Sequence, residues 1–273
     1  MKEALGLPNV GVVHQAFAVY PDFLKLHWRI FRPVTESQQL FDLADRLRAD
    51  AYTRIFTYLD VPDLGLQDPS MGRELMRVTE LSQYQNSLLL LIAAAQYQAF
   101  EGPVGSPVAP DRVAARHPLF DTPLPAVDEH RPPAQVRPVL EKMRRGFGEP
   151  FIAPDYLALA SWPEFFAAYW AALKNCMQSP LYQGCHHNTR ETAWMLAREL
   201  PGPFELTYEL LAERGIAEED VSSLVRITEM FVDNLSRTLL NTAIARIGLE
   251  GGGQSAVRKP TEAVQAPGEE RAA

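Results

Sequence analysis

Cysteine is scarce in this sequence of 273 residues, which contains only Cys176 and Cys185. Eight residues separate the two, so they do not form the close Cys-x-x-Cys pair of redox-active helical proteins, and they fit free thiols in a reducing compartment. His186 and His187 follow Cys185, but tandem histidines on a helix point about 100° apart and cannot readily share a metal ion. The sequence therefore predicts no metal or redox centre.

Long apolar runs are absent, and basic residues are outnumbered by acidic ones. The longest apolar run, residues 88–95, is far shorter than the roughly 20 residues of a membrane helix, and residues 1–5 form no apolar signal region. With 26 basic and 34 acidic residues the net charge is -8, and no basic stripe with interleaved aromatic residues is present. We therefore expect a soluble cytoplasmic protein that binds neither nucleic acid nor membrane.

Strand patterns are also missing, whereas helical patterns recur. No stretch alternates with period two, but apolar residues from Leu40 to Tyr58 recur at three- and four-residue spacing, so the sequence predicts an all-α fold. We expect Thr35 to cap the helix that contains Leu40, and a second helix over residues 71–100 to break near residues 82–87. Further helices are predicted over residues 134–145, 155–161, 164–177, 189–200, 203–212 and 221–247.

A change of composition divides the chain. Residues 102–133 hold eight prolines, more than a helix tolerates, and they predict a linker long enough to wrap between two halves. Residues 1–101 and 134–250 are the two helical repeats predicted on either side of it. Residues 251–273 are rich in Gly, Pro, Glu and Ala and predict a disordered tail.

The two predicted halves are similar in sequence. Residues 17–23 align with residues 159–165 at an offset of 142, and residues 77–81 align with residues 226–230 at an offset of 149. The phrase aromatic-Pro-acid-Phe is common at helix corners, so one match alone would carry little weight. Two matches in the same order favour a duplication, with two pseudo-symmetric halves packed as an intramolecular pseudo-dimer and the proline-rich segment strapped between them.

Positions that differ between the halves are candidates for function, because a cleft between two such halves is a natural pocket. Asp155 corresponds to Val13 at the offset of 142, and Asn86 corresponds to Leu235 at the offset of 149. Asp155 is either an ordinary acid at a helix N-terminus or a general base at the edge of an apolar pocket. Asn86 is either a turn or capping residue or an amide that orients a water molecule.

Several short stretches occur in a definite order along the chain. The most distinctive, residues 155–163, reads Asp-Tyr-Leu-Ala-Leu-Ala-Ser-Trp-Pro. The others lie at residues 7–29, 84–94, 117–118, 123–128 and 249–251. In this order they cover most of the chain, and the chain resembles the group I 2-haloacid dehalogenases, a helical family that acts on both enantiomers.

The resemblance implies a reaction and places it on two residues. The family's catalytic aspartate falls on Asp155, and its water-orienting asparagine falls on Asn86. The family pattern implies a hydrolase in which the carboxylate activates a water molecule that displaces halide from C2 of a 2-haloalkanoic acid with inversion. It implies no covalent ester and no need for a cofactor or metal.

Four positions depart from the family pattern and are expected to line the substrate pocket. Asn9 and Val12 replace large aromatic residues, Phe231 replaces a tyrosine, and Pro154 replaces a small polar residue next to the base. These changes predict a wider or differently polar pocket. The alternative is a relative in the peroxidase-like helical fold group that does not dehalogenate and has a redox or binding role. The oligomeric state stays open, with a homodimer as one alternative.

Overall fold

The computed structural model describes residues 2–7, 11–65, 68–111, 124–148 and 151–255. Within these ranges the chain is helical, and its β contacts are three isolated bridges, which confirms the predicted all-α fold. No helix in the described ranges is both long and apolar enough to cross a membrane. Asn9, one of the expected pocket residues, lies outside the described residues.

The first half of the chain ends in one long helix. The short α1 and α2 are followed by a 3-10 turn, η1, and then by three longer helices. The bounds are α1 Lys2–Leu5, α2 Val12–Ala16, η1 Phe17–Val19, α3 Pro21–Thr35, α4 Gln38–Tyr58 and α5 Pro69–Ala99. Pro69 stands at the start of α5, where its missing N–H needs no partner, and the Asp68 carboxylate caps this helix by accepting from the Ser70 N–H.

The second half also ends in one long helix. Its elements are α6 Arg137–Phe147, α7 Pro154–Leu159, α8 Pro163–Met177, α9 Pro180–Ala197, α10 Tyr208–Glu213 and α11 Glu218–Leu249. Proline begins α7, α8 and α9, and the Ser179 hydroxyl caps α9 by accepting from the Leu181 N–H. Gly148 follows α6 with φ 68°, the left-handed conformation in which glycine commonly ends a helix.

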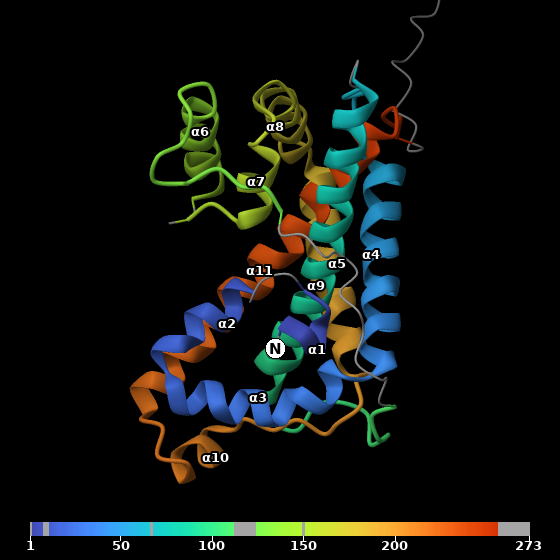
Figure 1. Cartoon of the computed structure of the whole chain (residues 1–273). Helices are drawn as coiled ribbons and strands as arrows, with labels where there is room; N and C mark the ends of the chain where they lie inside the picture. The colour runs from blue at the N-terminus through green and yellow to red at the C-terminus, as the bar shows by residue number, and fades with distance from the viewer. Residues whose placement is uncertain (1, 8–10, 66–67, 112–123, 149–150, 256–273) are drawn as a thin grey trace, which may run out of the picture.

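The long helices α5 and α11 pack against each other in antiparallel directions at the centre of the molecule, with α4 and α9 beside them (Figure 1). The amide of Gln96, near the end of α5, donates to Thr228 Oγ1 early in α11 at 2.6 Å. Arg246, near the end of α11, donates to Gln83 Oε1 at 3.5 Å. Residues 88–95 are buried on all sides of α5, as expected for a helix that is apolar all round.

Two of the predicted boundaries in the first half are wrong. The long helix does not break near residues 82–87, because Ser82 and Ser87 keep helical geometry and are buried, and the Ser87 hydroxyl donates to the carbonyl of Tyr84. Thr35 is the last residue of α3 and does not cap the next helix. The N-cap of α4 is Ser37, whose hydroxyl accepts from the Leu40 N–H.

Two predicted boundaries in the second half are also wrong. α9 begins at Pro180, nine residues before the predicted start at Thr189. α10 begins at Tyr208, because the segment expected to start the helix at Pro203 instead pairs with the linker. Phe204 and Val104 exchange two backbone hydrogen bonds, at 2.8 and 2.9 Å, in a bridge that holds this segment extended.

The two halves share a series of elements, although in the described part of the chain α10 in the second half and the turn η1 in the first have no counterpart. A short helix, α2 or α7, leads to an aromatic residue followed by proline, and then to α3 or α8, each of which has 15 residues. Tyr20 (φ -120°, ψ 72°) and Trp162 (φ -118°, ψ 87°) make these corners with nearly the same backbone conformation. This likeness fits the predicted duplication, and the division into two repeats stays a prediction.

The described ends of the proline-rich segment contact both halves. The carbonyl of Asp111 accepts from the Gln38 N–H at the start of α4, and the Val127 N–H donates to Leu157 O in α7. Residues 112–123 lie outside the description. At the other end of the chain, residues 251–255 pack on the loop after α4, where Gly253 and Val61 form a bridge; residues 256–273 are outside the described part.

Candidate active site

Asp155 lies in the first turn of α7, directly after Pro154. It does not cap the helix, and its side chain is buried, with only 6% of its surface exposed. An acid placed at a helix start only for its interaction with the helix dipole would remain in water. The burial of this carboxylate therefore needs polar partners.

Asn86 is the first of these partners. It lies in the middle of α5, is 2% exposed, and donates its Nδ2–H to Asp155 Oδ1 at 3.1 Å. α5 belongs to the first predicted half and α7 to the second. The structure therefore brings together two sequence-predicted site residues from opposite halves of the chain.

Burial and hydrogen bonding act on Asp155 in opposite directions. Removal from water raises the pKa of the Asp155 carboxyl, because the charged form loses its hydration. The Ser82 hydroxyl, the Asn86 amide and the backbone N–H of Asp155 itself oppose this rise in pKa. A carboxylate with a raised pKa is a better proton acceptor, which suits a general base.

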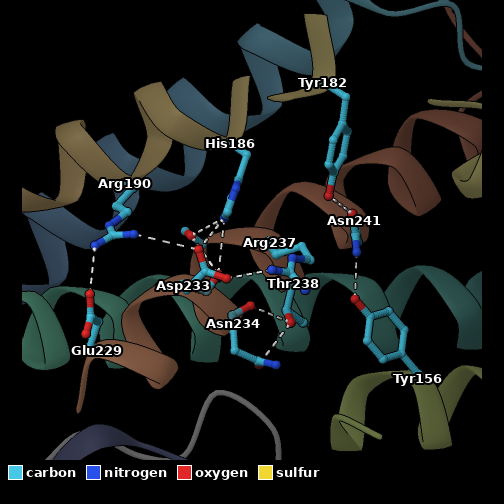
Figure 2. A network of polar contacts seen from close by, with 11 residues as sticks. Tyr156, Tyr182, His186, Arg190, Glu229, Asp233, Asn234, Arg237, Thr238 and Asn241 are labelled. Carbon is cyan, nitrogen blue, oxygen red and sulfur yellow. Dashed lines mark hydrogen bonds and ion pairs between the residues drawn. The ribbon is translucent and has the colours of Figure 1, made fainter. Parts of the chain in front are cut away.

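α7 is held in place by a chain of buried hydrogen bonds next to Asp155 (Figure 2). The Tyr156 hydroxyl accepts from Asn241 Nδ2 of α11 at 2.7 Å, and Asn241 Oδ1 accepts from the Tyr182 hydroxyl of α9 at 2.6 Å. All three side chains are buried. This network ties the short α7 to two longer helices and thereby fixes the position of the neighbouring acid.

A small cavity of about 20 Å³ lies in front of Asp155 and Asn86. This volume is close to the minimum that one water molecule needs. Val12, Pro154 and Phe231, expected from the sequence as pocket residues, line the same cavity. Asp155 is the one ionisable group of this lining among the described residues.

Three polar residues of the lining were not predicted from the sequence: Gln85 of α5, and Asn234 and Thr238 of α11. Thr238 donates to the carbonyl of Asn234 at 2.9 Å (Figure 2). Gln85 and Asn234 are related by the offset of 149, as Asn86 and Leu235 are. Applying that offset to every residue near Asn86 would have pointed to Asn234.

A second polar cluster lies beside the cavity on α9 and α11 but does not line it (Figure 2). His186 Nε2 contacts both Ser236 Oγ, at 2.8 Å, and Asp233 Oδ1, at 3.6 Å. A catalytic triad needs the acid and the nucleophile on different ring nitrogens, so this group is not a triad. Asp233 also pairs with Arg190 and Arg237, which is typical of a structural ion-pair network.

Neither cysteine has the environment that a reactive thiolate needs. Cys176 and Cys185 are free and buried, and burial raises the pKa of the Cys176 thiol to about 11. A reactive cysteine needs the opposite shift, because the thiolate is the nucleophile. Among the described residues, no three His, Cys, Asp or Glu side chains gather to hold a metal ion.

The chain is all-helical in its described part, and it buries one carboxylate beside an amide at a cavity that fits a water molecule. These features define a class: helical proteins with a candidate acid–base site. The family model described as halocarboxylic acid dehydrogenase DehI matches residues 8–156, which include Asn86 and Asp155. The match covers more than half of the chain, so the chain belongs to this family. The narrower group I assignment stays a prediction.

Curated relatives of this chain carry a dehalogenase name. A protein of Pseudomonas putida named (R)-2-haloacid dehalogenase is 25% identical over 253 residues, covering 88% of this chain and 84% of the relative. A protein of the same name from Rhizobium sp. (strain NHG3) is 24% identical over 220 residues, covering 77% and 85% of the two chains. These relatives confirm the family to which the sequence stretches pointed.

Solved structures share the fold. The crystal structure of a D-2-haloacid dehalogenase mutant superposes with a TM-score of 0.82 at 22% identity, covering 91% of this chain and 89% of the other. A complex of D-2-haloacid dehalogenase with L-LA gives a TM-score of 0.83 at the same identity and coverage. At this sequence identity, the structural similarity is evidence for a shared fold alone.

Proposed function

We propose that the protein is a hydrolytic dehalogenase of 2-haloalkanoic acids, with Asp155 as the general base and Asn86 as the residue that positions the attacking water. The observation that carries the proposal is the buried hydrogen bond of 3.1 Å between Asn86 and Asp155 at a cavity that fits one water molecule. The family and the names of the curated relatives support the substrate class.

The proposed reaction is a direct displacement. Asp155 takes a proton from the water molecule, and the water oxygen forms a bond to C2 on the side opposite the halogen. The carbon–halogen bond breaks as its electron pair leaves with the halide, so C2 is inverted and a 2-hydroxy acid forms. The proton on Asp155 then passes to solvent, and the carboxylate is ready for the next turnover.

The geometry at Asp155 favours this route over attack by Asp155 itself. Asn86 Nδ2 donates to Oδ1 and so fixes the orientation of the carboxylate beside a cavity that fits one water molecule. Burial raises the pKa of Asp155, which makes it a better acceptor for a proton of that water. A water molecule between the carboxylate and C2 suits a base acting through water and no ester intermediate.

Halide release tests the proposal directly. Purified protein is incubated with each enantiomer of 2-chloropropionate and with longer 2-haloacids, and chloride is measured. Asp155→Ala should lower the rate by at least about a hundredfold, the contribution of a general base. Glu164→Ala is the matched control, because Glu164 is an exposed acid in the first turn of the next helix, α8, and its removal should leave the rate unchanged.

Two results would contradict the proposal. The first is absence of chloride with every 2-haloacid, which would remove the dehalogenase function. The second comes from a single turnover in heavy-oxygen water: label in the Asp155 carboxylate, and not in the product, would establish an ester intermediate. Thermal melts of Asp155→Ala and Glu164→Ala must show folded proteins for the comparison to hold.

A further inference from the structure

Ser82 lies one helical turn before Asn86 on α5, a spacing that places both side chains on the same face of the helix. It is 2% exposed, and its hydroxyl oxygen meets no partner at full hydrogen-bond geometry. It nevertheless lies close enough to Asp155 to oppose the rise in the pKa of that carboxyl. A buried hydroxyl of this kind needs a partner, and the carboxylate is the acceptor beside it.

We propose that Ser82 is a positioning residue for the proposed hydrolysis, and that it and Asn86 form a two-donor clamp on α5 that holds the Asp155 carboxylate in its ionised, reactive orientation. This inference rests on the proposed function and extends it to a residue outside the cavity lining. Two donors on successive turns of one rigid helix hold a carboxylate in place better than either donor alone. The hydroxyl rotates freely about its C–O bond, so it can follow the carboxylate as the proton is taken up.

The duplication fits this assignment. At the offset of 149, Ser82 corresponds to Phe231 and Asn86 corresponds to Leu235. Both donors of the clamp are thus replaced by apolar side chains in the second half, just as Asp155 corresponds to Val13 in the first half. The acid lies on α7 and its two donors lie on α5. Their three apolar counterparts lie on the corresponding helices, α2 and α11.

Among the described groups that face Asp155, none is a cation that could stabilise its negative charge. The element α8 contributes the neutral phenol of Tyr169, whose pKa is raised first by burial and also by nearby groups that include the Asp155 charge. The α2 side of the cavity contributes valines. The α11 side contributes uncharged groups, namely Phe231, Asn234, Leu235 and Thr238. The ionised form of Asp155 therefore depends on neutral donors, and the loss of one donor should be measurable.

The pH profile of Ser82→Ala tests the clamp. Loss of a hydrogen bond to the ionised Asp155 carboxylate should shift the acid limb of the pH profile of kcat to higher pH by about one unit. On that limb the rate should be about tenfold lower than in the wild type. At pH values well above the limb, the rate should return to within about threefold of the wild type. Ser82→Thr keeps the hydroxyl and should restore the original limb. Ser82→Cys, a weaker donor of similar size, should give a smaller upward shift and serves if Ser82→Ala does not fold.

Ser87→Ala is the matched control. Ser87 is equally buried on the same helix and, like Ser82, does not line the cavity. Its hydroxyl, however, donates to the backbone carbonyl of Tyr84. This variant should leave the acid limb in place even if it lowers stability. If the acid limbs of Ser82→Ala and the wild type coincide, or if both serine variants lower the rate equally at every pH, the clamp is wrong.

A second readout separates failure of the clamp from failure of the proposed function. The pKa of Asp155 can be measured in the resting protein by carboxyl carbon NMR, with Asp155→Asn to assign the signal. Ser82→Ala should raise this pKa relative to Ser87→Ala whether or not the protein releases halide. An unchanged pKa in Ser82→Ala overturns the clamp, whereas absence of halide release from the wild type overturns only the proposed function.

Discussion

At the scale of single residues, Asp155 combines its proposed role as a base with a loss of stability. Burial raises its pKa above the ordinary value of 3.8, so the unfolded chain holds the proton less tightly than the folded protein does. Stability linked to this group is therefore full at low pH and falls as pH rises through the folded pKa. Residues selected for function are often destabilising in this way.

Asp155→Asn should consequently be more stable than the wild type at pH 8, because a neutral amide of the same shape avoids the buried charge. We expect a Tm higher by about 2–4 °C, the change that about 1 kcal/mol gives in a protein of this size. The difference should shrink toward zero as pH falls below 4, where both side chains are neutral. Thermal melts between pH 4 and 8 measure it, and a variant less stable than the wild type at pH 8 would contradict it.

A pair of buried histidines predicts the opposite pH dependence. His14 and His27 are buried with ring centroids 5.5 Å apart, and three of their four ring nitrogens have no partner. Burial lowers the pKa of His14 to about 4 and holds the pKa of His27 well below its ordinary value of 6.5, although the Gln96 side chain opposes the change at His27. The unfolded chain therefore binds more protons, and stability should fall as pH drops from about 6.5 toward 4.

His27→Phe should weaken this pH dependence and raise stability. The ring of His27 stacks on Phe31 at 4.6 Å, an arrangement that phenylalanine can keep, while two unpaired buried nitrogens disappear. We expect a gain of about 1–2 kcal/mol in the free energy of unfolding, measured by urea denaturation at pH 7 and again at pH 5. A loss of stability at both values would show that the nitrogens have partners in solution.

The site residues show what could be read from the sequence at this scale. Asp155 and Asn86 are candidates because each has an apolar counterpart in the other half, Val13 and Leu235, while their roles as base and water-orienting amide come from the family resemblance. The structure places the two polar groups in contact. Ser82 lies in the stretch of residues 82–87 where the sequence predicts a helix break, so the sequence does not mark it as a site residue. The direction of its side chain depends on the packing of α5 against α7, which sequence spacing alone did not provide.

At the scale of elements, apolar spacing in the sequence predicts that the helices exist. It does not predict where several of these helices begin or end. The start of α9 at Pro180 carries a clear local signal, a capping serine, Ser179, followed by proline. The start of α10 carries a signal too, the N-cap Thr207, whose hydroxyl accepts from the Leu210 N–H. The extended conformation of Phe204 before it, in contrast, depends on a bridge to Val104, a contact across 100 residues. Boundaries set by such distant pairing are not visible in a local pattern.

Two helical glycines make the effect of packing on an element testable. A Cβ at Gly248 in α11 would lie 2.6 Å from Leu64 Cδ1, and the Gly248 carbonyl also accepts from the Leu64 N–H, so the loop cannot move away freely. Gly184 in α9 is exposed and has no atom within 4 Å of an added Cβ. The same substitution should therefore have opposite effects at the two positions.

Gly248→Ala should lower the free energy of unfolding by about 1–3 kcal/mol through overpacking. Gly184→Ala should raise it by about 1 kcal/mol, because alanine has the higher helix propensity. Chemical denaturation of the two variants beside the wild type measures both changes. Equal effects at the two glycines would show that the loop after α4 does not press on α11.

At the scale of the whole molecule, the cavity lining follows the offsets of the predicted duplication. Val12 and Val13 correspond to Pro154 and Asp155, and three positions of α5 correspond to three of α11. The α5 and α11 pairs are Gln85 with Asn234, Asn86 with Leu235, and Leu89 with Thr238. Ten of the lining residues thus fall into five pairs, which is expected of a pocket on a pseudo-symmetry axis.

This pairing predicts that the pocket has one polar end and one apolar end. Because Asp155 contacts Asn86, their counterparts Val13 and Leu235 should face each other in the same cavity, and both line it. If the acid and amide hold the water, as proposed, the apolar pair is left to receive the alkyl group of a 2-haloacid. Val13 and Leu235 should then limit the length of the alkyl chain that the pocket accepts.

Leu235→Ala should shift the preference toward longer substrates. Each methylene that gains a buried place adds about 0.8 kcal/mol, or about fourfold in kcat/KM, so the ratio of 2-chlorobutanoate to 2-chloropropionate should rise by about that factor. Leu239→Ala is the control, since Leu239 is a buried leucine of the same helix that does not line the cavity, and its loss should change stability without changing the ratio. A change in the bromide-to-chloride ratio, with the chain-length ratio unchanged, would instead place the halogen against Leu235. That result would assign the apolar end of the pseudo-symmetric pocket to the leaving group.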